Sequence, residues 1–238
     1  VNSSSGKEIK LYPNISHDRI VEFYLGNITK LEVDRLIAGN LKLVAKNRDG
    51  NIVYETMIQM AGLLDELYFY SPNDLGISFV NNQIKIKLWS PVALSVKINL
   101  YQNETDLAPE KVLDLNKDDN GVWSIQVDKN FKNYFYTYSV NVFNPNLKAM
   151  VTNEVTDPYS ISLSMNSTKS QLVDVNDPML MPKGFKTFSQ LSKPNKIIYE
   201  AHLRDLTSYD FGIPEKLRGK YLALTQKNGK AYQHLKEL

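Results

Sequence analysis

Cysteine is absent from the 238 residues, which excludes a disulfide framework and any metal site built from thiolates. No apolar run approaches the roughly 18 residues that a membrane-spanning helix needs, so we expect no membrane span. The first residues, Val1–Ser5, lack the basic-then-apolar order of a secretory signal. We therefore expect that this chain carries no signal sequence.

An excess of charge of one sign is also lacking. The chain has 28 Lys and Arg against 26 Asp and Glu, a formal net charge of +2. The basic residues are scattered singly or in pairs, whereas nucleic-acid-binding proteins carry a basic stripe that neutralises phosphates. We therefore expect no nucleic-acid partner. The hydrophobic content of 42% is ample for one or two packed β-domains.

The pattern over most of the first two-thirds of the chain predicts short strands separated by turns. A turn at Asn47–Gly50 lies between the β-prone segments Leu41–Val44 and Ile52–Tyr54, which predicts a hairpin. Period-two alternation, typical of half-buried strands, follows at Ile84, Ile86 and Leu88, at Val96, Ile98 and Leu100, at Val122–Val127 and at Tyr134–Val142. Strands at roughly ten-residue spacing favour a β-sandwich over alternating strands and helices.

The last third of the chain has a different character. Residues 166–195 have few periodic apolar positions, which predicts an extended connector, and contain Pro178, Pro182 and Pro194. Lys196–Glu200 then predicts a strand, and Ala231–Leu238 predicts the beginning of a helix. A strand, a long loop and a helix form one unit of a larger α/β architecture.

Three segments resemble the family 48 carbohydrate-binding module: Leu88–Pro91, Gly121–Trp123 and Tyr136–Tyr138. The segments that flank them resemble the surroundings of that module in glycoside hydrolase family 13 debranching enzymes, specifically bacterial type I pullulanases. These flanking segments are Ala61–Leu67, Val155–Ser160, Ser170–Asp174, Ile198–Asp205 and Arg218–Thr225, the last followed by His234–Lys236. The blocks keep the family's order from about residue 36 onwards.

The resemblance implies a parent enzyme that hydrolyses α-1,6 branch points in pullulan, glycogen or starch dextrins with retention of configuration. Retaining hydrolysis needs a nucleophilic and a proton-donating carboxyl group about 5–5.5 Å apart. In the family these groups follow later barrel strands, so we expect no catalytic residue in this chain. By the same resemblance, the parent enzyme requires no cofactor, and calcium is suggested by family analogy alone. The resemblance also implies a secreted or cell-surface bacterial enzyme.

Two carboxylates and a histidine lie where the first barrel strand is expected. Glu200 and Asp205 flank it, and His202 lies between them. We expect Asp205 to pair with Arg204 or to cap a loop, and Glu200 and His202 to have structural roles. With no second histidine nearby in the sequence, a metal site is not expected here.

Residues 114–118 begin like a calcium-binding loop. An EF-hand loop needs Gly at its sixth position and Glu at its twelfth, where this chain has Asp119 and Ile125. Asp119-Asn120-Gly121 is instead good hairpin-turn chemistry, so we interpret the segment as a turn.

The two tryptophans, Trp89 and Trp123, are the candidate sugar platforms, because the apolar face of glucose stacks on an indole. Trp89 falls on the strand face opposite Ile84, Ile86 and Leu88, and Trp123 lies near a strand end. The competing hypothesis gives both rings a packing role, with Trp89 at a junction between modules. The aromatic positions Tyr134, Tyr136 and Tyr138 share one face with Val140 and Val142 and are expected core.

We therefore predict a mostly β chain: immunoglobulin-like β-sandwich modules followed by the first βα unit of a (β/α)8 barrel. The expected parts are a β-rich accessory domain at 1–66, a family 48-like sandwich at 67–165, a connector at 166–194 and the barrel start at 195–238. The expected partners are α-glucan and the remainder of the barrel. Two other hypotheses stay open: a stand-alone glucan-binding or scaffolding protein, and a β-sandwich interaction protein without sugar affinity.

Overall fold

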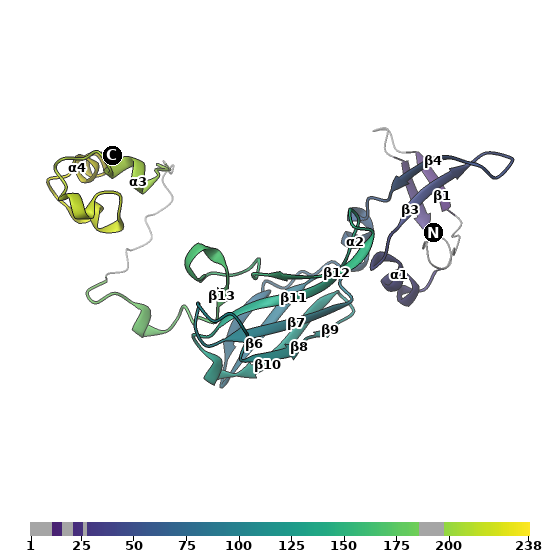
Figure 1. Ribbon diagram of the computed structural model, residues 1–238, viewed down its shortest axis with the longest axis horizontal. Helices are drawn as coiled ribbons and strands as arrows, with labels where there is room; N and C mark the ends of the chain where they lie inside the picture. The colour runs from purple at the N-terminus through teal and green to yellow at the C-terminus, as the bar shows by residue number, and fades with distance from the viewer. Residues whose placement is uncertain (1–10, 16–20, 26–27, 186–197) are drawn as a thin grey trace. The chain divides into compact units, whose positions relative to one another are not determined.

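The computed structural model describes residues 11–15, 21–25, 28–185 and 198–238. The chain divides into two compact units, Val1–Met181 and Pro182–Leu238 (Figure 1). No helix among the described residues is long and apolar enough to cross a membrane.

Two hairpins and two helices precede the main sheets in the first unit. They are β1 (Leu11–Ile15) paired with β2 (Val21–Leu25), α1 (Lys30–Ile37), β3 (Lys42–Lys46) paired with β4 (Ile52–Met57), and α2 (Ala61–Leu67). The turn between β3 and β4 confirms the predicted hairpin. The Asn47 side chain accepts hydrogen bonds from the main-chain N–H groups of Asp49 and Asn51, and Gly50 has φ +84°.

Helix α1 begins with a capping box. The Thr29 hydroxyl accepts a hydrogen bond from the Glu32 N–H, and the Glu32 carboxylate accepts one from the Thr29 N–H, at 3.3 and 3.1 Å. This exchange satisfies N–H groups that the first turn leaves without helical partners. The helix buries one face, formed by Val33, Leu36 and Ile37.

Two antiparallel sheets form the main body of the first unit (Figure 1). The first has the order β5 (Gly76–Val80), β6 (Gln83–Trp89), β10 (Val122–Asp128), β9 (Asn116–Lys117). The second has the order β12 (Ala149–Val155), β11 (Phe135–Asn144), β7 (Ser95–Tyr101), β8 (Lys111–Asp114), and β13 (Ser170–Gln171) also pairs with β11. The prediction of a mostly β fold is confirmed.

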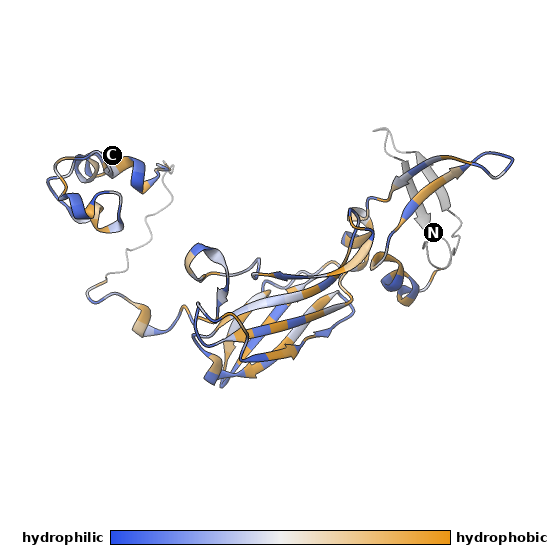
Figure 2. Cartoon of the chain, in the orientation of Figure 1, coloured by the Kyte–Doolittle hydropathy of each residue, from blue (hydrophilic) through white to orange (hydrophobic). Residues whose placement is uncertain are grey.

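One hydrophobic core is shared by both sheets. The alternation predicted from the sequence sets its members, as the alternating colours along the strands in Figure 2 show. The fully buried side chains from the two sheets include Ile84, Ile86, Ile98, Leu100, Tyr136 and Tyr138, and Tyr134 and Val142 pack at the edge.

A buried carboxylate fixes the segment that follows β12. The Asp157 side chain accepts hydrogen bonds from the hydroxyls of Tyr136 and Tyr138, at 2.7 and 3.2 Å, and from the Tyr159 N–H at 2.8 Å. The pKa of Asp157 is raised above its usual value by burial, and these three hydrogen bonds only partly oppose that effect. Short 3-10 turns at Lys129–Phe131, Met165–Ser167 and Pro178–Leu180 complete this unit.

The second unit is helical where it is described. It contains α3 (Leu203–Thr207), 3-10 turns at Glu215–Leu217 and Tyr221–Thr225, and α4 (Lys230–Glu237). Helix α4 confirms the helix predicted at Ala231–Leu238.

The predicted strand at Lys196–Glu200 is not seen in the second unit. Lys196 and Ile197 lie outside the described residues, Ile198–His202 have no regular structure, and α3 begins at Leu203. A barrel strand is stabilised by hydrogen bonds to a neighbour on each side, and the described residues of this unit supply no such neighbour. The first βα unit of a barrel is therefore not visible in the described part of this unit.

Candidate functional site

The outward face of the first sheet carries the polar side chains of β6 and β10. On β6, Lys85, Lys87 and Trp89 alternate with the core residues, which confirms the predicted face of Trp89. The strand register places Lys85 opposite Gln126 and Lys87 opposite Ser124.

One end of this face is covered by residues of α1, of α2 and of the segment that follows α2. Tyr68 is fully buried in a cluster with Val33 and Ile37, and Trp89 and Val92 pack against it. We call this group the junction cluster. The Trp89 Nε1–H donates a hydrogen bond to the Tyr68 main-chain oxygen at 2.9 Å. The position of Trp89 therefore gives its partly buried ring a packing role.

Charged groups surround Tyr68. Its hydroxyl donates a hydrogen bond to the Asp34 carboxylate, and the Lys30 ammonium lies 4.4 Å from its ring centroid. Burial and the hydrogen bond to Asp34 raise the pKa of Tyr68 well above its usual value. Burial acts to raise the pKa of Asp34 too, but hydrogen bonds from Tyr68 and Lys30 leave it below its usual range.

Trp123 faces the core of the two sheets. Its ring is 7% exposed, and its Nε1–H donates a hydrogen bond to the Ser90 main-chain oxygen at 2.9 Å. The Lys117 ammonium lies 5.8 Å from the ring centroid and donates to the Pro91 main-chain oxygen at 2.6 Å. A sugar could stack on Trp123 only after the chain that covers it had moved. Stacking on either tryptophan stays a prediction.

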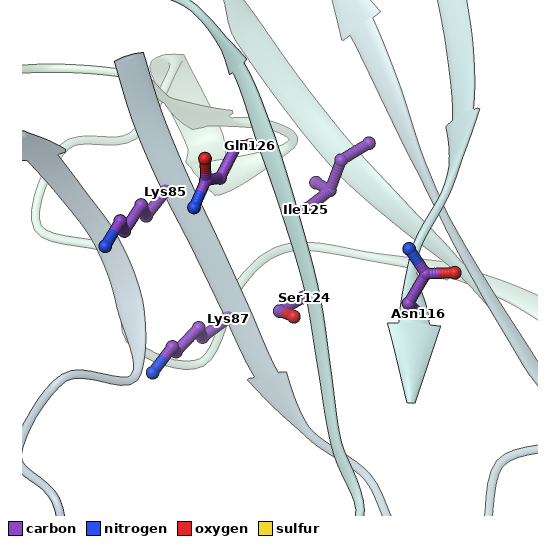
Figure 3. Close-up of a pocket in the computed structure, with 6 residues that line it drawn as sticks. All are labelled: Lys85, Lys87, Asn116, Ser124, Ile125 and Gln126. Atoms are coloured by element: carbon purple, nitrogen blue, oxygen red, sulfur yellow. The ribbon is translucent and has the colours of Figure 1, made fainter. Parts of the chain in front are cut away.

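An open recess lies on the same outward face, beyond Trp89. It has a volume of about 270 Å³ and is lined by Lys85, Lys87, Asn116, Ser124, Ile125 and Gln126 (Figure 3). Ser124 lies between Lys87 and Asn116 in this view, and the register pairs it with both. This recess was not expected from the sequence. Its only signal was the run of polar residues at the outward positions of two adjacent strands.

The charge of Lys87 is balanced within the structure. Its ammonium contacts the Asp74 carboxylate and donates to the Tyr70 hydroxyl at 2.9 Å. Hydrogen bonds from Lys87 and Tyr70 lower the pKa of Asp74, and the hydrogen bond to Asp74 raises the pKa of Lys87. Lys85 adds a smaller electrostatic effect on Asp74.

The outward face of the second sheet differs, because its polar groups bind one another. Asn99 donates to the hydroxyls of Thr137 and Ser139 at 3.1 and 2.8 Å. Glu154 accepts hydrogen bonds from Tyr101 and Thr137, both at 2.7 Å. These groups are therefore already satisfied within the protein.

The carboxylates considered at the predicted barrel strand form no enclosed site. Glu200, His202 and Asp205 are all exposed. The Asp205 carboxylate lies 3.3 Å from His202 Nδ1, so its observed contact is with His202 rather than the expected Arg204.

The segment suggested as a calcium loop is a turn, as interpreted from the sequence. Asp118 Oδ1 accepts hydrogen bonds from the N–H groups of Asn120 and Val122, both at 2.9 Å, and Gly121 has φ +74°. In the described part of the chain, no group of three or more His, Asp or Glu side chains is placed to hold a metal ion.

Comparison with known proteins identifies the β-rich part of the first unit. Residues 74–160 match the family described as carbohydrate-binding module 48 (isoamylase N-terminal domain). Pullulanase of Klebsiella pneumoniae is 37% identical over 221 residues, which cover 87% of this chain and 20% of the relative. Pullulanase 1, chloroplastic, of Arabidopsis thaliana is 32% identical over 218 residues, covering 87% of this chain and 22% of the relative.

Solved structures agree with these relatives. PulA of Klebsiella pneumoniae in its maltotriose complex superposes with a TM-score of 0.81 at 31% identity, covering 100% of this chain and 28% of that one. The aligned part of the chain spans about a fifth of the length of the two curated relatives. Residues 74–160 therefore match the family 48 carbohydrate-binding modules, and the chain as a whole resembles the N-terminal, non-catalytic portion of the pullulanases.

Proposed function

We propose that this chain is the non-catalytic front part of an enzyme that hydrolyses α-1,6-glucosidic branch points in pullulan, glycogen or starch dextrins, with retention. The observation that carries the proposal is the family 48 match at residues 74–160 within a chain that aligns with pullulanases over 87% of its length. The two sheets that share one core support an immunoglobulin-like sandwich within residues 67–165.

The rest of the proposed organisation follows from the resemblance. Residues 1–66 form an accessory domain, 166–194 a connector, and 195–238 the start of a (β/α)8 barrel completed by the remainder of the enzyme. Exposed large apolar side chains in the second unit support such a partner, since a surface of this kind favours burial against other polypeptide. They include Tyr209, Phe211, Tyr221 and Leu222, at 86, 81, 87 and 60% exposed.

We also propose α-glucan as the ligand of the module, with Trp89 and Trp123 as the candidate stacking residues. The catalytic chemistry requires no cofactor, and calcium remains an analogy with the family. A secreted or cell-surface bacterial location is part of the same proposal, although one relative carries the word chloroplastic in its name.

Two measurements on the 238-residue chain test this proposal. Migration in a native gel that contains pullulan should be retarded relative to a gel without polysaccharide. Incubation with pullulan or maltodextrin should release no reducing sugar above the blank. Hydrolysis that follows the 27.2 kDa species through purification would contradict the non-catalytic assignment. Unchanged migration would favour an interaction module without sugar affinity.

A further inference from the structure

Four of the side chains that line the recess have polar groups available to a ligand. Lys85, Asn116, Ser124 and Gln126 form no side-chain hydrogen bond with any other described residue, in contrast to the paired groups of the second sheet. Ser124 and Lys85 are half-buried, and Asn116 and Gln126 are exposed. Such groups are hydrated in the free protein and can exchange water for ligand hydroxyls.

The strand register gives the recess a defined shape. Lys87, Ser124 and Asn116 form one row across β6, β10 and β9, and Lys85 and Gln126 form the next row. Neighbouring strands lie about 4.8 Å apart, so a row across three strands spans about 10 Å. The Ser124 side chain is shorter than those of Lys87 and Asn116 on either side of it, which leaves the hollow above Ser124 (Figure 3).

The size of the recess limits the ligand. Its volume of about 270 Å³ lies just below the range of about 300–1,000 Å³ found for sites that hold drug-sized ligands. A single sugar ring of a longer chain fits this space, and the open side leaves room for its neighbours.

The donor and acceptor pattern favours a neutral polyol over an anion. The amides of Asn116 and Gln126 and the hydroxyl of Ser124 both donate and accept, which matches adjacent sugar hydroxyls. An anion at neutral pH presents mainly acceptors and favours sites that are rich in donors and positive charge. Asp74 balances the charge of Lys87, which leaves Lys85 as the one cation in the lining without a hydrogen-bonded carboxylate among the described residues.

We propose that this recess is a glucan subsite that binds one glucose residue through its hydroxyl groups. The inference rests on the proposed glucan ligand and adds a location distinct from the rings of Trp89 and Trp123. None of the described residues that line the recess is aromatic, so binding depends on hydrogen bonds exchanged with water. We expect a dissociation constant in the approximately millimolar range.

Titration of the ¹⁵N-labelled 238-residue chain with maltotriose, followed by amide chemical shifts, tests the proposal. The main-chain amides of Ser124 and Gln126 and the side-chain amides of Asn116 and Gln126 should shift together and saturate. The indole N–H signals of Trp89 and Trp123 report separately on the stacking sites. A parallel titration with inorganic phosphate tests the anion alternative.

Variants then link the shifts to the recess. Gln126→Ala should weaken maltotriose binding about fivefold, the effect of one lost hydrogen bond. Ser124→Gln should abolish the recess shifts, because the longer side chain fills the hollow. Lys85→Ala should also weaken binding, whereas Lys97→Ala, which removes an exposed lysine from β7 in the other sheet, should leave the constant unchanged. The fold of each variant is checked by the dispersion of its core amide signals.

The outcomes separate the two proposals. Maltotriose shifts at the indoles or elsewhere, with silent recess amides, would overturn the subsite and leave the glucan function standing. Saturation of the recess by phosphate but not by maltotriose would also overturn it. No shift at any residue, together with unretarded migration in pullulan gels, would overturn both.

Discussion

The indole Nε1–H of Trp89, the last residue of β6, donates a hydrogen bond to the main-chain oxygen of Tyr68, the residue that follows α2. This bond connects the carbohydrate-binding module to the segment that precedes it. The ring of Trp89 also packs against the junction cluster, in which Tyr68 is fully buried. Trp89 therefore has a structural partner whether or not it also contacts sugar.

We predict that Trp89→Ala lowers the free energy of unfolding by about 3–5 kcal/mol, the range for truncation of a large packed aromatic side chain. The loss combines removed packing in the junction cluster with an unpaired main-chain oxygen at Tyr68. Urea unfolding followed by far-ultraviolet circular dichroism measures the change.

Trp89→Phe is the matched variant, because it keeps an aromatic ring but removes the indole N–H donor. We expect a smaller loss, of about 1–2 kcal/mol. If Trp89→Ala kept its stability but lost affinity for pullulan, the ring would be a sugar platform rather than a packing residue.

Two glycines with positive φ provide a second test. Gly50 (φ +84°) has open space where a Cβ would be added, whereas a Cβ on Gly121 (φ +74°) would lie 2.7 Å from the Pro91 Cβ and 3.2 Å from the Tyr68 ring. Gly50→Ala should cost about 1–2 kcal/mol of stability from the left-handed backbone alone. Gly121→Ala should cost about 2–5 kcal/mol, because the steric overlap adds to that strain.

Thermal unfolding of both alanine variants under identical conditions checks this order. Equal losses would show that the contact between the turn and the junction cluster is loose, and would also weaken the prediction for Trp89.

The buried carboxylate of Asp157 predicts a pH-dependent contribution to stability. Burial raises its pKa, so between the unfolded and folded values the folded chain binds more protons than the unfolded chain. The contribution of Asp157 to the free energy of unfolding therefore falls as pH rises above about 3.8 through the raised pKa. Several other carboxylates, including Asp34 and Asp74, have lowered pKa values and act in the opposite sense.

Asp157→Asn isolates this effect, since the variant keeps a side-chain oxygen that accepts from Tyr136. The stability of the parent relative to Asp157→Asn should decline between pH 4 and pH 7, as measured by urea unfolding at each pH. Asp119→Asn, at an exposed turn residue, serves as the control. A parent-minus-variant difference that is constant over this range would contradict the prediction.

The strands were predictable because burial has a clear period. Ile84, Ile86 and Leu88 alternate with polar residues, and the hairpin around Asn47–Gly50 uses turn chemistry that is local in the sequence. These features depend on neighbours within a few residues.

Features that depend on distant partners were not predictable. The recess exists because register places Ser124 beside both Lys87 and Asn116, and no local pattern encodes that pairing. A packing role at a junction was one of the two hypotheses for Trp89, but its partner Tyr68 lies 21 positions away and no local pattern indicates it. The strand expected near Ile198 shows the opposite case, in which a strand-like pattern lacks a strand partner among the described residues.

The last prediction concerns the second unit, where a buried carboxylate caps α4 from a distance. Asp210 is 6% exposed, and its two oxygens accept hydrogen bonds from the main-chain N–H groups of Gly212, at 3.0 Å, and Ala231, at 3.2 Å. Ala231 is in the first turn of α4, where an N–H has no helical partner. The negative charge also lies at the favourable end of the helix dipole.

Asp210→Ala should therefore destabilise α4 by about 1–2 kcal/mol, the effect of losing a helix cap. Hydrogen exchange of the main-chain amides of residues 233–238 should quicken about 5- to 30-fold if exchange follows local opening. Amides of β6 and β10, in the other unit, should keep their rates. Glu215→Ala, which removes an exposed carboxylate from the same unit, should leave all rates unchanged. Equal exchange in Asp210→Ala and the parent would show that α4 does not depend on this cap.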